Sequence, residues 1–377
     1  KYSFLDATVD VKGTAYETIV SNTLKQEAGQ FFTPRNVIKC MVEILNPTVN
    51  TRVLDPACGS GGFLVMVLDH VRKQITKNMY PELSDALIEV KANSDEVNDK
   101  VRKYAENMIF GFDFDPDLKK AAKMNMVMAG DGHSNIFNIN SLEYPNGTLP
   151  DKDVVSAAVA KSVERKGDGP DCDTKYALSN AMGKFDMIFT NPPFGSKVEV
   201  ASTIAENYEL KAFSAPEVLF IEQCYNFLKP GGKMGIVLPD GILGNPNTEP
   251  VRKWILQHFK LIASIDLPVE TFLPQVGVQA SLLFLQKKTA LEMLQDYSKE
   301  EYDVFMAIAE KVGKDRRGNV IYERDDDGAE MLFVEKKEWA SYNRQGELVA
   351  RHRVERVKHV DDDLPKISAE YKQFMEK

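Results

Sequence analysis

Short apolar runs alternate along the chain with longer segments whose apolar residues recur at helical spacing. Runs of about four to six residues bounded by polar turns predict buried strands, and the segments between them predict helices on both faces of a sheet. The pattern therefore predicts an α/β fold built on a doubly wound, mostly parallel sheet. Its seven strands are expected at residues 52–55, 108–113, 136–139, 186–190, 235–239, 262–267 and 280–285.

The segments that flank this alternation predict a division into three parts. Apolar residues recur at helical spacing in residues 1–28, which are expected to form a helical lead. Residues 29–290 hold the seven strands and form the main domain. Residues 291–377 are charged and form a C-terminal extension suited to partner docking, with weak strands and a final helix expected at 302–309 and 367–374.

Three polar segments interrupt the main domain. Residues 73–106 predict a helical insertion. Residues 145–183 are rich in Gly, Asp and Lys and predict a surface loop with a short helix. Residues 197–215 predict a lid over the mouth of the strand at 186–190.

Composition narrows the class of protein. The chain of 377 residues is long enough for one large α/β domain with a smaller appendage. It contains no run of eighteen apolar residues, so no membrane span is expected. Scattered cysteines without C-x-x-C spacing favour a cytoplasmic protein and predict no metal site. These cysteines are Cys40, Cys58, Cys172 and Cys224.

A strand, a tight glycine turn and a helix are expected at residues 52–71. Asp55 ends the strand, and Gly59 and Gly61 allow the backbone to turn sharply and to approach a ligand closely. The spacing matches neither G-x-G-x-x-G nor a P-loop, and the Asp55 carboxylate would repel a pyrophosphate. The loop, which includes Ala57, is therefore expected to bind a cationic group such as the ammonium of an amino-acid moiety.

Two later strands end in polar residues that suit a nucleoside. Asp113 ends an apolar run and is expected to accept hydrogen bonds from ribose hydroxyls. Asn140 follows the next run, where its amide is placed to read the edge of an adenine. Together with Asp55, these residues predict a site for S-adenosylmethionine.

Asn191, Pro192, Pro193 and Phe194 follow the expected strand at 186–190. The side-chain oxygen of Asn191 and the carbonyl of Pro192 can both accept hydrogens from one exocyclic amine. The ring of Phe194 can lie on the heterocycle that carries this amine. Proline fixes φ and lacks the N–H donor, which favours outward-facing acceptors. The motif predicts a clamp for the amino group of a nucleobase, although Asn-Pro-Pro also occurs in ordinary turns.

These motifs, in this order, resemble those of amino-group DNA methyltransferases. The glycine loop reads Asp-Pro-Ala-Cys-Gly-Ser-Gly-Gly, and the clamp reads Asn-Pro-Pro-Phe. Upstream, Gly-Gln-Phe-Phe-Thr-Pro-Arg at 29–35 is similar to the first cofactor motif of N6-adenine methyltransferases. This segment, with residues 273–285 and 313–319, is similar to the modification (methylase) subunit of type I restriction-modification systems. The resemblance covers residues 13–325.

The resemblance implies the Rossmann-like fold of a class I S-adenosylmethionine-dependent methyltransferase, in which the last strand inserts antiparallel. It implies methyl transfer from S-adenosylmethionine to N6 of an adenine flipped out of double-stranded DNA. The catalytic residues would be Asn191, Pro192, Pro193 and Phe194. The cofactor would be bound by Phe32, Thr33, Pro34, Asp55, Ala57, Gly59, Gly61, Asp113 and Asn140.

The resemblance also implies an assembly. No target-recognition domain is recognisable, so a separate specificity subunit is expected to choose the DNA sequence. A restriction subunit with nuclease and translocase activity is a further expected partner. The net charge of −9 fits a catalytic subunit that leaves most phosphate contacts to a basic partner.

The chain departs from the family pattern in two places. Asn140 stands where relatives usually have Asp, which predicts altered rather than lost cofactor contact. The usual helical N-terminal region is largely absent, so we expect the sequence to be a fragment of a longer protein.

Several alternatives share parts of this pattern. Methylation of RNA or of a protein glutamine also uses an Asn-Pro-Pro clamp, although Phe194 and residues 29–35 favour DNA. Cytosine N4 has the same amine geometry as adenine N6, so the choice of adenine depends on the resemblance. Carbon-5 cytosine methylation needs a nucleophilic cysteine after proline, which none of the four cysteines provides. A non-catalytic assembly subunit that binds the cofactor structurally is a further alternative. The intact Asn-Pro-Pro-Phe motif argues against it, because such a subunit would have been free to lose the clamp.

Overall fold

A computed structural model describes most of the chain beyond the first motif. The described residues are 32–130, 135–146, 151–166, 181–195, 202–213, 215–346 and 348–376. The predicted helical lead at 1–28 and the start of the 29–35 motif lie outside these residues. Among the described residues, no helix is both long enough and apolar enough to cross a membrane.

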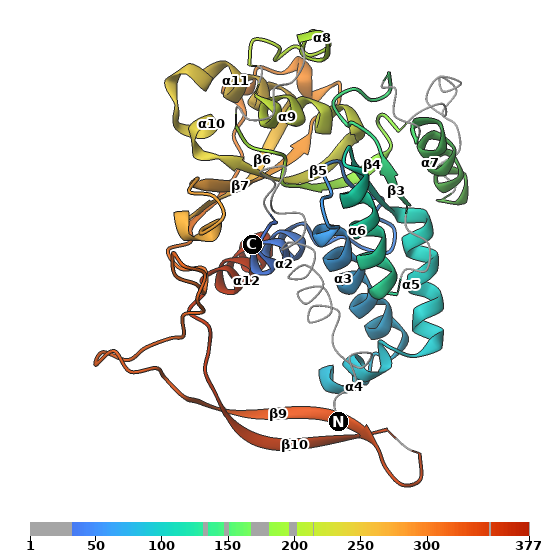
Figure 1. Ribbon diagram of the computed structural model, residues 1–377, viewed down its shortest axis with the longest axis vertical. Helices are drawn as coiled ribbons and strands as arrows, with labels where there is room; N and C mark the ends of the chain where they lie inside the picture. The colour runs from blue at the N-terminus through green and yellow to red at the C-terminus, as the bar shows by residue number, and fades with distance from the viewer. Residues whose placement is uncertain are drawn as a thin grey trace.

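Eight strands form one sheet in the order β3-β2-β1-β4-β5-β7-β6-β8 (Figure 1). Strand β7 is antiparallel to its neighbours β5 and β6, and the other neighbouring strands are parallel. The predicted α/β class, parallel sheet and antiparallel insertion are therefore confirmed. The strands are β1 (Val53–Asp55), β2 (Ile109–Asp113), β3 (Asn135–Asn138), β4 (Phe185–Thr190), β5 (Leu228–Pro239), β6 (Phe259–Leu267), β7 (Ala280–Lys287) and β8 (Phe305–Ile308).

The expected number of seven strands was wrong, because β8 extends the sheet. Strand β8 pairs in parallel with β6, and its residues alternate between half-buried and exposed. Met306 and Ile308 are exposed apolar residues on this edge strand. Such an edge has only one pairing partner and buries little of its apolar surface, so its sequence signal is weak.

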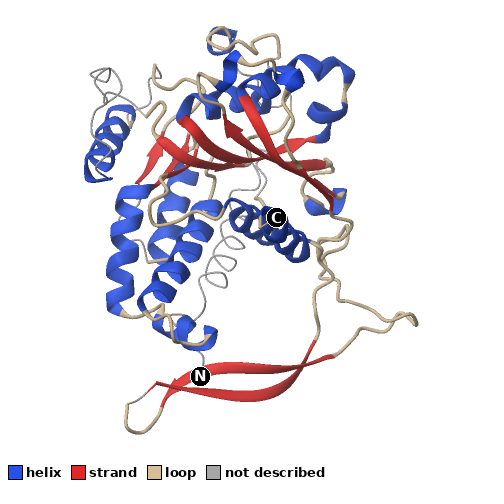
Figure 2. Ribbon diagram, turned by 180° about the vertical axis from the view of Figure 1, so that it is seen from behind, coloured by secondary structure: helices blue, strands red, loops and turns tan. Residues whose placement is uncertain are grey.

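Helices cover both faces of the sheet, as Figure 2 shows. One core cluster joins the sheet to α2, α3, α5, α6 and α12, and the other joins it to α7, α9, α10 and α11. The helices are α2 (Arg35–Leu45), α3 (Gly62–Met79), α4 (Asp85–Lys91), α5 (Asp95–Met108), α6 (Pro116–Met128), α7 (Lys152–Lys166), α8 (Ser202–Ala205), α9 (Pro216–Phe227), α10 (Asp240–Gly244), α11 (Glu249–His258) and α12 (Leu364–Met375).

The helical insertion expected at residues 73–106 is confirmed, and the segment at 145–183 contains a longer helix than expected. Residues 73–106 contain the end of α3, then α4 and most of α5, whose Val97 and Val101 are fully buried. The loop expected at 145–183 contains the fifteen-residue helix α7. This helix is held by Arg52, whose Nε donates to Ser162 Oγ over 2.7 Å.

The C-terminal extension contributes to the main domain. Leu364, Ile367 and Tyr371 of α12 belong to the same core cluster as α2. Ser368 Oγ donates to Glu43 Oε2 over 2.6 Å, so the two helices are also joined by a polar contact. The predicted boundary at residue 290 therefore separates segments that share one core.

A long antiparallel ribbon stands apart from the sheet. It consists of β9 (Phe333–Tyr342) and β10 (Leu348–Val357), and both strands contact α4 (Figure 1). A role for this extension in partner docking stays a prediction.

Candidate functional site

The glycine loop connects β1 to α3 at the carboxyl edge of the sheet. Gly59 and Gly61 adopt positive φ angles of 51° and 81°. A Cβ at Gly61 would lie 3.3 Å from Ala122 Cβ, so the close approach of α6 requires glycine there. A Cβ at Gly59 would meet no atom within 4 Å, so the backbone at Gly59 faces open space.

Asp113, at the end of β2, fastens this loop. Its Oδ2 accepts from the Gly59 N–H and its Oδ1 accepts from the Asp115 N–H, both over 2.9 Å. The side chain is 7% exposed, and burial raises the pKa of the carboxyl to about 6. Each oxygen retains a second lone pair, so a ribose hydroxyl remains a feasible further donor.

Asp55 is more deeply buried than Asp113. Its residue is 1% exposed, and its Oδ1 accepts from the Ala57 N–H over 3.1 Å. Burial raises the pKa of the Asp55 carboxyl to about 8, which opposes the ionised form. A cation beside this carboxyl would favour the ionised form and compensate for the lost solvation.

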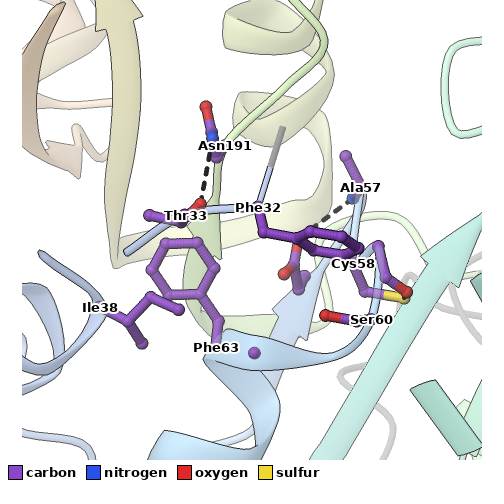
Figure 3. A pocket seen from close by; sticks show the side chains of 11 residues that line it. Phe32, Thr33, Ile38, Ala57, Cys58, Ser60, Phe63 and Asn191 are labelled. Atoms are coloured by element: carbon purple, nitrogen blue, oxygen red, sulfur yellow. Dashed lines mark hydrogen bonds between the residues drawn. The ribbon is translucent and has the colours of Figure 1, made fainter. Parts of the chain in front are cut away.

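A pocket opens above the loop (Figure 3). Asp55, Ala57 and Gly59 line it from β1 and the loop, and Phe32, Thr33 and Asn191 line it from two other segments. The empty space is about 350 Å³ and is partly open to solvent. The structure thus brings together six of the predicted site residues. Five further lining residues were not predicted: Ile38, Cys58, Ser60, Gly62 and Phe63.

The missed residues carry different sequence signals. Ser60, Gly62 and Phe63 belong to the glycine loop or directly follow it, so they could have been included. Cys58 is buried, and burial raises the pKa of its thiol well above the usual value, which opposes nucleophilic reactivity. Ile38 lies in the first turns of α2, and only the packing of α2 against the sheet brings it to the pocket.

The other predicted cofactor residues are not among those that line the pocket: Pro34, Gly61, Asp113 and Asn140. Pro34 precedes α2, and its carbonyl accepts from the Ile38 N–H over 3.0 Å. Asn140 holds a turn, because its Oδ1 accepts from the Leu142 N–H and its Nδ2 donates to Glu143 Oε1. Contact between Asn140 and an adenine stays a prediction.

The clamp follows β4 directly. Pro192 is buried, whereas Pro193 and Phe194 are half-buried. The Phe194 ring meets Phe272 edge to face, with 6.3 Å between centroids. The chain then turns at Gly195, which has a φ of 82° and whose N–H donates to Glu217 Oε2 over 3.3 Å.

Asn191 is the polar centre of the clamp. Its Nδ2 donates to Thr33 Oγ1 over 3.0 Å, which joins the 29–35 motif to the clamp. Its Oδ1 is buried and has no hydrogen-bond partner among the described residues. Buried acceptors are nearly always paired, so this oxygen is suited to a donor from a ligand.

Comparison with solved structures identifies the class of fold. One match, with a TM-score of 0.51 and 19% identity, covers 81% of this chain and 75% of a Listeria monocytogenes protein described as a class I S-adenosylmethionine-dependent methyltransferase. Another, with a TM-score of 0.53 and 21% identity, covers 91% of this chain and 64% of a protein from Vibrio vulnificus. That protein is described as a modification subunit of a type I restriction enzyme. The fold is therefore that of class I S-adenosylmethionine-dependent methyltransferases.

The family is established by sequence. The model of the N-6 DNA methylase family matches residues 7–362, so the chain belongs to this family. The chain is 27% identical over 280 residues to the methylase subunit of the type I restriction enzyme EcoEI from Escherichia coli, covering 73% of this chain and 46% of that protein. It is 26% identical over 290 residues to the EcoKI methylase subunit from Escherichia coli K12, covering 75% and 46%. The predicted family resemblance is confirmed, and the chain spans about half the length of these relatives.

Proposed function

We propose that the chain is the catalytic part of a methylase subunit that transfers a methyl group from S-adenosylmethionine to N6 of adenine in DNA. The observation that carries this proposal is the buried Oδ1 of Asn191, which has no hydrogen-bond partner among the described residues and lies in the wall of the pocket that also contains Asp55. One group supplies an acceptor for an amine, and the other supplies a carboxyl for a cation.

The residues of the pocket fit the cofactor. S-adenosylmethionine supplies an electrophilic methyl group on a sulfonium. Asp55 would hold the ammonium of its amino-acid moiety, and Gly59 leaves open space for close approach. Phe32 and Phe63 would form apolar walls. In this proposal, Asp113 accepts from the ribose and Asn140 contacts the adenine, whereas Thr33, Pro34, Ala57 and Gly61 shape the surrounding backbone.

The clamp acts on the target amine by position and electrostatics. The lone pair of an adenine N6 is delocalised into the ring, which makes the nitrogen a poor nucleophile. Asn191 Oδ1 and the Pro192 carbonyl would accept its two hydrogens and favour a tetrahedral nitrogen. Phe194 would stack on the base and offset part of the unstacking cost of about a few kcal/mol.

The family favours DNA adenine over the alternatives. The relatives are named methylase subunits of type I restriction enzymes, which supports double-stranded DNA as the substrate. It also supports a specificity subunit and a restriction subunit as partners, in the cytoplasm. Methylation of RNA, of a protein glutamine or of cytosine N4 would give different labelled products, which the experiment below distinguishes.

Methyl transfer from labelled cofactor tests the proposal. The chain would be co-expressed with the genes that neighbour its own, and the DNA nucleosides would be separated by mass spectrometry. We expect N6-methyladenine from the native chain, and a loss of at least about 10³-fold for Asn191→Ala, because one acceptor of the clamp disappears. Cofactor affinity should stay within about threefold, since the Asp55 side of the pocket is intact.

The matched control is Asn247→Ala, which removes the same side chain from an exposed position in a short 3₁₀ helix (Pro246–Thr248). It should leave transfer unchanged. Label in RNA, protein or N4-methylcytosine, or full activity of Asn191→Ala, would overturn the proposal.

A further inference from the structure

The hydrogen bond between Thr33 and Asn191 joins two motifs that are 158 residues apart. Both side chains line the pocket, and Figure 3 shows the Asn191 nitrogen turned toward Thr33 and the oxygen turned away. The oxygen is the atom left without a partner among the described residues. The contact therefore coincides with the one amide orientation that leaves an acceptor available.

The orientation of this amide decides what the clamp can bind. The two ends of an asparagine amide have similar shapes, but one donates and the other accepts. Rotation about the terminal torsion of asparagine is soft, so the amide alone does not select one direction. With the NH₂ group turned toward the clamp, two donors would face the hydrogens of the target amine.

We propose that Thr33 is a positioning residue that sets the direction of the Asn191 amide. This role rests on the proposed function. A hydroxyl can accept from Asn191 Nδ2 while its own proton goes to another acceptor, such as a carboxylate in the pocket. Once that proton is engaged, Thr33 can only accept from Asn191, and Oδ1 is fixed toward the amine.

The backbone supports such a role for Thr33. The next residue, Pro34, leads directly into α2, whose Val37, Ile38 and Met41 are buried in the main core. The helix is further held by Asn36, whose Nδ2 donates to Asp362 Oδ2 over 2.9 Å. Thr33 therefore presents its hydroxyl from a fixed point.

Thr33→Val and Thr33→Ser separate positioning from cofactor binding. Valine keeps the shape but removes the hydroxyl, and serine restores it. At saturating S-adenosylmethionine and DNA, we expect kcat of Thr33→Val to fall by about 10- to 100-fold, as for other small misplacements of reacting groups. Serine should recover most of the native kcat. A residue that only bound the cofactor would lose affinity, and saturation would restore its kcat.

A second substitution tests the amide directly. Aspartate at position 191 presents an acceptor at both ends, so its direction needs no selection. The loss caused by Thr33→Val should therefore shrink to less than about threefold in the Asn191→Asp background. Thr48→Val is the matched control, because it removes an exposed threonine hydroxyl outside the pocket and should leave kcat unchanged.

The outcomes distinguish the two levels of the proposal. A native assembly that transfers no methyl to adenine overturns the proposed function. A native assembly that is active, with Thr33→Val unchanged in kcat or restored by saturating cofactor, overturns only the positioning role. Failure of Thr33→Ser to recover activity, with native thermal stability, also overturns it. If Asn191→Asp is inactive, the valine and serine variants decide alone.

Discussion

The two sides of the pocket differ in how their polar groups are satisfied. On the glycine-loop side, Asp113 accepts from two backbone N–H groups and Asp55 from one. On the clamp side, Asn191 Nδ2 donates to Thr33, whereas Asn191 Oδ1 has no partner among the described residues. The two carboxylates therefore stabilise the loop and can also bind a ligand. Asn191 Oδ1 stabilises no described part of the fold and is suited to binding a ligand. Stability and activity should therefore respond differently to mutation on each side.

The largest loss of stability is expected for Asp113→Ala. This change removes the acceptor of the Gly59 and Asp115 N–H groups and leaves two partly buried donors unpaired. Relief of the buried carboxylate offsets part of the cost, so we expect the free energy of unfolding to fall by about 2 kcal/mol. Urea denaturation measures it. Asp99→Ala, which removes an exposed carboxylate, is the control, and an equal effect of both variants would contradict the role of Asp113.

For Asp55→Asn we expect the free energy of unfolding to rise, by an amount smaller than the loss expected for Asp113→Ala. The folded protein keeps the Asp55 proton up to about pH 8, whereas the unfolded chain releases it near pH 4. Raising the pH between these values therefore destabilises the folded state. Asparagine keeps the acceptor for Ala57 and does not titrate, so this variant should be more stable at pH 8 by about 1–2 kcal/mol.

The measurement is urea denaturation of both proteins from pH 5 to pH 8. The difference should grow with pH and shrink toward acid. The same variant should bind S-adenosylmethionine at least about tenfold more weakly, because the carboxylate is lost. A more stable variant with native affinity would remove Asp55 from the proposed cofactor site.

The smallest effect on stability is expected for Asn191→Ala, the variant with the largest expected loss of activity. Its bond to Thr33 is lost, but a buried acceptor without a partner disappears as well. These terms oppose each other, so the free energy of unfolding should change by less than about 0.5 kcal/mol. Thermal unfolding checks this. A loss above about 2 kcal/mol would place Asn191 among the residues that stabilise the fold, and the proposed difference between the two sides of the pocket would then be wrong.

The central fold was predictable because its signals are local. The strands β1 and β2 are apolar runs that end in Asp55 and Asp113, Asn191 directly follows β4, and the parallel sheet brings these ends to one edge. Helix α7 is longer than the short helix expected within residues 145–183, because few of its residues are large and apolar and its attachment involves Arg52, which lies 110 residues before Ser162. Strand β8 was missed as part of the sheet because, within the part of the chain that the structure describes, it pairs with β6 alone.

The site was predictable in its composition but not in its orientation. The resemblance to amino-group DNA methyltransferases implied that Thr33 and Asn191 belong to one site. It could not reveal that the amide nitrogen faces Thr33, since this direction depends on two side chains meeting in space. The packing of α12 on α2 could not be predicted from the sequence either, because the contact joins Glu43 to Ser368, 325 residues later.

The packing of α12 on α2 has a consequence for synthesis of the chain. Helix α2, which carries Thr33 at its entrance, leaves the ribosome long before α12, which covers part of its apolar face. Before α12 is made, all the motif residues have been translated, but α2, which follows Thr33, still lacks the packing of α12. A chain truncated before Leu364 would therefore keep all the signature residues but have an incompletely anchored pocket.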